Sequence, residues 1–486
     1  MKIKAIIGTT VAIIVCAIPP VCSFADNPVV QTNFTADPAP VVYNGTVYLY
    51  TSHDEDNATG FLMRNWMCYT TTDMANWTDH GIIASLKDFK WADSAISGWG
   101  GFDNGAWAPQ CIERDGKFYM YCPVQGRGIG VLVADSPFGP FTDPLGKPLI
   151  GGQFDSIDPT VFIDDDGQAY LYWGNPHLWY AKLNKDMISV SGAPVMCSPT
   201  PAHYQEGPWF YRRNGHYYMA FASTCCPEGI GYSMSDSPTG PWPFVGYIML
   251  PDGRSSGNHP GIIDYKGNSY VFGFNYKLNN AITPIHHERR SVCVELMTYN
   301  ADGTINTVPW WSDEGPPQIG TLDPYVRNEA ETICYSGGIK SELCSAGGLD
   351  VYPKAAGAYI KVKGVNFSNA GASTFTASVA CGALSGATTG GVIELHVDQK
   401  DGPLIGTLQT SDTGGAWAMR TIPVSGATGT HDLYFVFTGD TVGDTLKFDY
   451  WRFGKRTLKR TMGANTPNRR SASFSPAKTA IRNMEL

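Results

Sequence analysis

Short runs of alternating apolar and polar residues, separated by Gly, Asn, Asp and Pro, dominate the chain from residue 27 to residue 310. Alternation of this kind predicts half-buried β-strands, and a glycine turn between two such runs predicts a hairpin. Five hairpins share one layout, in which a proline leads in, a glycine turns the chain and a tyrosine stands in the returning run. They are Pro38–Gly45, Pro109–Gly116, Pro159–Gly167, Pro208–Gly215 and Pro260–Gly267.

The spacing of these hairpins predicts the architecture. Their glycines lie 71, 51, 48 and 52 residues apart, close to the about 40 to 50 residues that a four-stranded propeller blade occupies. The segment DSPFGPF at 135–141 also returns as DSPTGPW at 236–242, which indicates an internal repeat. The sequence therefore predicts an all-β protein whose residues 27–310 form a five-bladed β-propeller.

A second domain follows a proline-rich stretch. Pro309, Pro316, Pro317 and Pro324 interrupt any regular element, so residues 311–326 are predicted to be a linker. Residues 327–454 then carry short alternating runs with glycine-rich turns and no helical period. This pattern predicts a β-sandwich of the jelly-roll kind.

The two ends of the chain differ from the domains. Lys2 and Lys4 precede an apolar run that ends before Ser23-Phe24-Ala25, which predicts a signal peptide over residues 1–25 and a secreted protein. No later apolar run is long enough to span a membrane. Residues 455–486 carry eight Lys or Arg residues and one acid, and are predicted to be a disordered tail.

Charge and cysteine content narrow the partners. The formal net charge of −9 argues against binding to nucleic acid. Export permits disulfides, for which Cys334 with Cys344 and the adjacent Cys225 and Cys226 are candidates. No cysteine pair has CxxC spacing, which argues against zinc.

The residues in front of the five prolines are predicted to converge on the propeller axis, because the proline-led strand of each hairpin is expected to be the innermost. They are Asp37, Ala108, Asp158, Glu206 (through Gly207) and His259. One such acid alone would be read as a turn residue, but three at equivalent places suit cleavage of a glycosidic bond, where one carboxyl protonates the leaving oxygen and another activates water. Crowding of like charges raises the pKa of at least one. Calcium binding is the competing interpretation, although five blades offer few oxygens at one radius.

The motifs around these acids resemble glycoside hydrolase family 43 over residues 27–320. The resemblance rests on TADP at 35–38, IDPT at 157–160, QEGP at 205–208 and the later Asn258-His259. It implies that Asp37 is the general base, Glu206 the general acid, and Asp158 the residue that orients Glu206 and tunes its pKa, with inversion at the anomeric carbon. It also implies that Arg290 contacts the sugar and that His259 reaches a cation, often calcium, on the axis. Further substrate-binding candidates are Trp107, His53 and Trp209.

The second domain resembles a family 6 carbohydrate-binding module. RNEAE at 327–331 and FDYW at 448–451 carry this resemblance, which implies a structural calcium held by Glu329, Glu331 and Asp449. Trp417, with Tyr352 or Tyr359, would sandwich a sugar. Lys447 and Met419 depart from the family pattern, since an asparagine and a tryptophan are common at those places.

These observations predict a secreted, inverting exo-glycosidase that removes terminal α-L-arabinofuranosyl residues from arabinoxylan of the plant cell wall. A β-1,4-xylosidase acting on xylo-oligosaccharides is the first alternative, because the family accommodates both sugars. A catalytically inactive, sugar-binding propeller and a wall-adhesion protein are the others. The adhesion hypothesis leaves the clustered acids unexplained.

Overall fold

The computed structural model describes residues 26–93, 104–152, 155–254, 258–382, 391–439 and 445–456. The predicted signal peptide, residues 1–25, lies outside these ranges, as does the predicted tail apart from residues 455 and 456. Within the described part of the chain, no helix has the length and apolar character needed to cross a bilayer.

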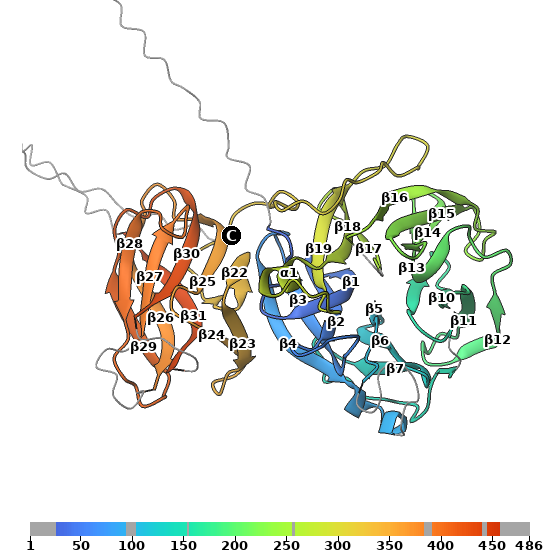
Figure 1. Ribbon diagram of the computed structural model, residues 1–486, viewed down its shortest axis with the longest axis horizontal. Coiled ribbons are helices and arrows are strands. Elements are labelled where there is room, and N and C mark those ends of the chain that lie inside the picture. Colours follow the sequence, from blue (N-terminus) through green and yellow to red (C-terminus); the bar gives the residue numbers. More distant parts are fainter. Residues whose placement is uncertain are drawn as a thin grey trace, which may run out of the picture.

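Five antiparallel sheets surround a common centre, which confirms the predicted propeller (Figure 1). Blades one and two contain β1 (Phe34–Tyr43), β2 (Thr46–Asp54), β3 (Asn65–Thr71), β4 (Trp77–Ser85), β5 (Gln110–Arg114), β6 (Lys117–Val124), β7 (Gly128–Ala134) and β8 (Ile150–Gly151). Blades three and four contain β9 (Thr160–Ile163), β10 (Ala169–Trp173), β11 (Trp179–Leu183), β12 (Val190–Met196), β13 (Tyr204–Arg213), β14 (His216–Ser223), β15 (Glu228–Ser235) and β16 (Phe244–Asp252). Blade five contains β17 (Gly261–Tyr265), β18 (Asn268–Asn275) and β19 (Ser291–Met297).

The few helical segments lie between these strands. They are η1 (Leu86–Asp88), η2 (Lys90–Asp93) and α1 (Lys277–Ile282). Strands β1, β5, β9 and β13 contact one another in that order, and β17 contacts β1. Because these are the proline-led strands, their starting residues meet at the centre, as the repeat predicts.

The segment before β1 closes the ring. The backbone N–H of Val29 donates to the carbonyl of Val292 in β19 over 2.9 Å. The fully buried Asn27 side chain donates to the Val294 carbonyl and accepts the Val294 N–H, each over 3.0 Å. Residues from both ends of the propeller sequence therefore stabilise blade five.

Two facing sheets form the second domain, which confirms the predicted sandwich. One sheet has the order β23 (Ile339–Leu343), β24 (Leu349–Pro353), β31 (Leu446–Lys455), β26 (Ala372–Cys381) and β29 (Ala418–Pro423), with β20 (Asn328–Glu329) paired to β31. The other has the order β22 (Tyr335–Gly337), β25 (Tyr359–Asn366), β30 (Thr430–Thr438), β27 (Val392–Val397) and β28 (Leu404–Gln409). A core of Val, Ile, Leu and aromatic side chains, including Trp451 and Phe435, fills the space between them.

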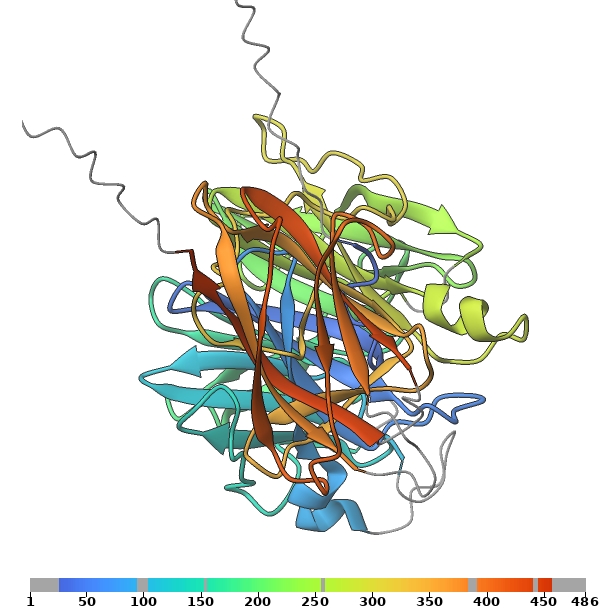
Figure 2. The ribbon, with the colours of Figure 1, turned by 90° about the vertical axis from the view of Figure 1, so that its left-hand side faces the viewer.

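The sandwich is joined to the propeller by backbone pairing. Strand β21 (Thr332–Ile333), from the beginning of the second domain, pairs with β4 and becomes the fifth strand of blade one. The buried Asp79 side chain of β4 accepts from the Ser341 hydroxyl of the sandwich over 2.8 Å. In Figure 2 the sandwich lies in front of the propeller, and its orange and red strands overlie the blades in this view.

Of the two suggested disulfides, one is formed in the structure and the other is not. Cys225 and Cys226 form a disulfide. Cys334 and Cys344 are free thiols, so the suggested short disulfide loop between them is wrong. Cys334 lies against Asp26, whereas Cys344 lies at the turn between β23 and β24 and accepts the N–H of Ala346.

Candidate active site

Irregular backbone at the starts of the inner strands presents the three predicted acids. The pairing of β1 with β2 shifts between Ala36 and Ala39, and that of β13 with β14 shifts between Glu206 and Trp209. Each shift contains a proline, which cannot donate to a ladder. Asp37 and Asp158 have left-handed backbones, with φ of 52° and 56°. Such bulges re-aim side chains that regular pairing would hold on the faces of a blade.

One cavity of about 350 Å³ collects these acids, a size at the lower end of the roughly 300 to 1,000 Å³ typical of small-molecule sites. Six predicted residues line it: Asp37, Trp107, Asp158, Glu206, His259 and Arg290. The sequence did not point to the others, among them Phe61, Met63, Gln125, Asn175, Glu228, Glu288 and the Cys225–Cys226 disulfide. Trp107 and Phe61 form an aromatic wall, with ring centroids 5.6 Å apart.

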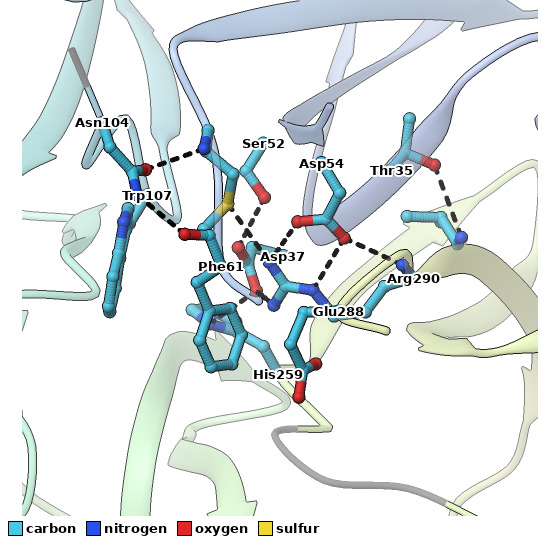
Figure 3. A network of polar contacts seen from close by, with 12 residues as sticks. Thr35, Asp37, Ser52, Asp54, Phe61, Asn104, Trp107, His259, Glu288 and Arg290 are labelled. Carbon is cyan, nitrogen blue, oxygen red and sulfur yellow. Dashed lines mark hydrogen bonds and ion pairs between the residues drawn. The ribbon is translucent and has the colours of Figure 1, made fainter. Parts of the chain in front are cut away.

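Asp37 is held from both of its carboxylate oxygens (Figure 3). Nη1 of Arg290 donates to Oδ1 over 2.9 Å, and the Ser52 hydroxyl donates to Oδ2 over 2.5 Å. An arginine partner and a hydroxyl donor both stabilise the negative form of a carboxylate. Because each oxygen has two lone pairs, the carboxylate can still accept a proton from water.

Arg290 is itself fixed by residues outside the predicted set. Nε and Nη2 donate to the two oxygens of the fully buried Asp54, and the guanidinium lies between the rings of Phe61 and Phe274. Burial raises the pKa of Asp54, an effect that the charge of Arg290 opposes. The resemblance implied a sugar contact for Arg290, whereas the contacts formed here direct its guanidinium to Asp37 and Asp54.

Glu206 has the properties of a proton donor. Burial, reinforced by the negative charge of Asp37, raises its pKa to about 7, although Arg290 and the Asn175 amide act in the opposite direction. The Asn175 amide donates to Oε2 of Glu206. Asn175 follows Gly174, whose carbonyl accepts the hydroxyl of Tyr204, so this loop is tied to the strand that carries Glu206.

Asp158 lies beside Glu206 and contacts its backbone neighbour. The N–H of Gly207 donates to Oδ2 of Asp158 over 3.1 Å, and Asp158 is only 4% exposed. Burial and the charges of Glu206 and Asp37 raise the pKa of Asp158. The contact orients the residue after Glu206. Because Asp158, Glu206 and Asp37 lie close together, their mutual repulsion favours a proton on the Asp158–Glu206 pair.

His259 packs between the acids. Its Nδ1 lies 3.9 Å from Oδ1 of Asp37, and burial lowers its pKa to about 4, so the imidazole is neutral at neutral pH. Gly207 lies against the imidazole ring, because a Cβ at this position would stand 2.9 Å from Cγ of His259. A cation at His259 remains a prediction.

Two substrate-binding candidates lie away from this cavity. His53 is hydrogen-bonded through Nδ1 to Asn65 over 2.9 Å. Trp209 is 6% exposed, and its indole N–H donates to the Ile262 carbonyl between blades four and five. Neither is among the residues that line the cavity. Trp209 instead packs in the hydrophobic core of the propeller.

The sandwich candidates are partly exposed. The indole N–H of Trp417 donates to Ser345 in the turn between β23 and β24, and Tyr352 stands on β24. Tyr359 belongs to the other sheet, where its ring lies 6.2 Å from that of Tyr434. Tyr352 therefore shares the sheet of β29 (Ala418–Pro423), the strand that Trp417 precedes. Lys447 pairs with Glu342.

Of the acids proposed for calcium, Glu331 lies at the interface of the two domains, beside Asp79 of β4. Glu331 is 5% exposed, and its Oε2 has no hydrogen-bond partner in the described structure. Burial and the charges of Glu329, Asp79 and Asp449 raise its pKa to about 9, and an orphaned buried carboxyl oxygen of this kind fits a cation. Glu329 and Asp449 instead face Arg327, at 2.7 and 3.5 Å. Over the described ranges, no three His, Cys, Asp or Glu side chains converge as a metal site.

Several residues of the site lay beyond sequence reasoning. Asn175 stands in an Asn-Pro dipeptide that is typical of turns, and Asp54 simply ends a strand. Glu228 follows the vicinal cysteines, which drew notice only as a disulfide candidate. A repeat predicts which strand starts converge, whereas these residues come from the ends of other strands and from loops.

A propeller cavity that combines an arginine-paired carboxylate with a second carboxyl whose pKa is raised to about 7 has the chemistry of a glycoside hydrolase. The chain matches glycosyl hydrolases family 43 over residues 25–305 and belongs to that family. Residues 329–455 match the carbohydrate binding module of family 6. Both predicted resemblances are thereby confirmed.

Three relatives show how far the similarity extends. The chain is 36% identical to an arabinoxylan arabinofuranohydrolase of Bacillus subtilis (strain 168), covering 88% of this chain and 92% of that protein. A Bacillus subtilis enzyme of the same name, solved with cellotetraose, superposes with a TM-score of 0.77 at 33% identity, over 89% of this chain and 99% of that one. A β-xylosidase/α-arabinofuranosidase from a compost metagenome, solved with xylotriose in a calcium-free form, covers 59% of this chain and 98% of that one, at 29% identity and a TM-score of 0.52.

Proposed function

We propose that this chain is an arabinoxylan arabinofuranohydrolase, a secreted exo-enzyme that removes single α-L-arabinofuranosyl residues. The observation that carries the proposal is that two carboxyls of one cavity have different environments: Arg290 pairs with Asp37, whereas burial raises the pKa of Glu206 to about 7. The similarity to the Bacillus subtilis arabinofuranohydrolase extends over both domains. A compact cavity of about 350 Å³ has room for a single terminal or branching sugar.

The proposed reaction uses the two carboxyls in one step. Asp37 accepts a proton from a water molecule while the water oxygen bonds to the anomeric carbon. The bond from that carbon to the leaving oxygen breaks, and Glu206 gives its proton to the leaving oxygen. Attack from the face opposite the leaving group inverts the anomeric carbon. Proton exchange with solvent then restores Asp37 as carboxylate and Glu206 as acid.

Asp158 has the role of a positioning residue. Its contact with the Gly207 N–H fixes the backbone beside Glu206, and a proton shared between these two carboxyls would keep Glu206 available as an acid. Trp107 and Phe61 would contact the apolar face of the sugar ring.

A β-xylosidase activity is the second candidate, because the compost-metagenome neighbour is described as having both activities. That neighbour covers 59% of this chain, whereas the two arabinofuranohydrolases cover 88% and 89% of it. Assays with nitrophenyl arabinofuranoside, nitrophenyl xyloside and arabinoxylan separate the two. Release of arabinose from arabinoxylan, with the inverted anomer seen first by NMR, is expected; retention of configuration would contradict the mechanism.

The inactive sugar-binding alternative is tested by Glu206→Ala. We expect a fall in arabinose release of about 10²-fold or more. Binding of the polysaccharide to the sandwich should persist in this variant. Hydrolysis unchanged by the substitution would show that Glu206 is not the acid.

Secretion, polysaccharide binding and calcium complete the proposal. The burial of Asn27 and Val29 in blade five supports a leader that ends before residue 27. Trp417 and Tyr352 would bind a wall polysaccharide, and Glu331 would supply one oxygen to a structural calcium. When bound, calcium would neutralise the acids at the domain interface.

A further inference from the structure

A fourth carboxyl, Glu228, lines the catalytic cavity. It begins β15 in blade four, directly after the Cys225–Cys226 disulfide and Pro227, and it is 2% exposed. Three acids are accounted for by the proposed mechanism, which gives Glu228 no task. A buried carboxyl without a task in a sugar-sized cavity calls for a physical explanation.

Among the described residues, one hydrogen bond holds the Glu228 carboxyl. Oε2 accepts the backbone N–H of Asn258 over 2.7 Å. Oε1 has no hydrogen-bond partner among the described residues, and no Lys, Arg or His of these residues lies within ion-pair distance of the carboxyl. The side chain is therefore anchored at one oxygen, and it lines the cavity.

The electrostatic setting favours a proton on Glu228. Burial, followed by the negative charge of Glu206, raises its pKa to about 8. A protonated carboxyl held at one oxygen offers an O–H donor and an acceptor at the other. This combination suits a sugar hydroxyl, which can both accept and donate.

We propose that Glu228 binds a hydroxyl group of the sugar in the catalytic cavity and thereby helps to determine which sugar the enzyme accepts. The inference rests on the proposed function, since it places the scissile sugar in this cavity. Its anchor, Asn258, precedes His259, so the same contact positions the segment beside Asp37. Glu228 takes no part in proton transfer to the leaving oxygen.

The test uses nitrophenyl arabinofuranoside and its three monodeoxy analogues, each lacking one hydroxyl. For the parent substrate, Glu228→Ala should raise KM about tenfold with kcat changed less than about twofold, as expected when a binding interaction of the ground state is lost. Glu228→Gln, which retains an anchor and a donor, should stay within about threefold of the wild type. For one deoxy analogue, wild type and Glu228→Ala should have equal KM, because the hydroxyl that Glu228 binds is absent.

A purely structural role gives a different pattern. If Glu228 only anchored Asn258, Glu228→Ala would raise KM by the same factor for all four substrates, and that result would overturn the proposal. Glu228→Asp is the second variant if the alanine protein does not fold; its shorter side chain cannot reach both partners, so it too should lose the discrimination. Glu295→Ala is the matched control, because Glu295 is partly buried and hydrogen-bonded to Ser312 but is not among the residues lining the cavity.

Failure of the proposed function is distinguished by a binding measurement. Calorimetric titration with L-arabinose and with D-xylose reports on Glu228 without turnover. A wild type that binds either sugar about tenfold more tightly than Glu228→Ala supports the site even if nitrophenyl arabinofuranoside is not hydrolysed. Equal affinities of wild type and Glu228→Ala for both sugars would refute it.

Discussion

Arg290 and Asp54 form a buried two-point ion pair, in which Nε and Nη2 each donate to a different carboxylate oxygen over 3.0 Å. The backbone N–H of Arg290 also donates to Asp54, over 2.8 Å. The guanidinium is thus fixed in orientation, and its remaining Nη1 is directed at Asp37. Asp54 does not line the cavity, but it fixes the position of the positively charged Arg290 guanidinium beside Asp37, the proposed base.

Asp54→Ala should therefore impair both stability and catalysis. Removal of one partner from a buried pair costs about 3 to 5 kcal/mol of unfolding free energy. We expect kcat/KM to fall about 10²-fold, because Arg290 can then reorient around Asp37. Asp135→Ala, which breaks the exposed Lys117–Asp135 pair, should leave both the unfolding free energy and kcat/KM nearly unaltered, because solvent screens such a pair. Equal effects of the two substitutions would contradict this role of Asp54.

The pH dependence of kcat/KM should report Glu206. The acid must be protonated to donate, so activity is expected to fall as pH rises through about 7, the pKa to which burial raises this carboxyl. The Asn175 amide lowers that pKa, so Asn175→Ala should move the alkaline limb to higher pH. An alkaline limb at the same pH in wild type and Asn175→Ala would show that Asn175 does not affect the pKa of the acid.

The stability of the domain interface should depend on Glu331. Its folded pKa of about 9 lies above the 4.5 of an unperturbed glutamate, so the folded chain holds this proton more tightly than the unfolded chain. The resulting stabilisation is complete below pH about 4.5 and is lost as pH rises toward about 9. Compared with Glu331→Gln, the wild type should lose more Tm between pH 5 and pH 9. Calcium should raise Tm at pH 8 for the wild type and not for the variant; the same response in both would exclude Glu331 as a ligand.

Gly207 tests the geometry behind Glu206. Its φ of 59° is left-handed, and a Cβ would stand 2.9 Å from the ring of His259. Gly207→Ala should displace Glu206 or His259 and lower kcat/KM about 10²-fold. Gly215→Ala, in the hairpin of the same blade, has a φ of 87° but no atom within 4 Å, so it should cost stability without this loss of activity.

The repeat made much of the fold predictable. A hairpin with a proline at its entry and a glycine at its turn encodes the innermost strand of a blade, so Asp37, Asp158 and Glu206 could be placed together although they lie far apart in the sequence. The additional pairing of β21 with β4 could not be foreseen, because a two-residue strand leaves no periodicity. The free Cys334 and Cys344 show similarly that closeness in sequence does not place two thiols together.

The support around the acids was less predictable than the acids. Asp54, Asn175 and Glu228 act through contacts whose partners lie on other blades or loops, and no local pattern distinguishes them from ordinary turn or strand residues. His53 and Trp209 have residue types that suit a sugar site, but neither lines the cavity. Residue type identified the chemistry, and tertiary contacts decided which side chains reach the cavity.

The pairing of β21 with β4 gives the sandwich a fixed place on the edge of blade one. When a flexible linker joins a binding module to a catalytic domain, the catalytic domain can reach many positions around the bound module. Here the cavity stands at a set distance and angle from any polysaccharide held by the sandwich. Such an enzyme would remove branches at one fixed distance from the point where the sandwich binds the polysaccharide. To reach the next branch, the sandwich would have to dissociate and bind again.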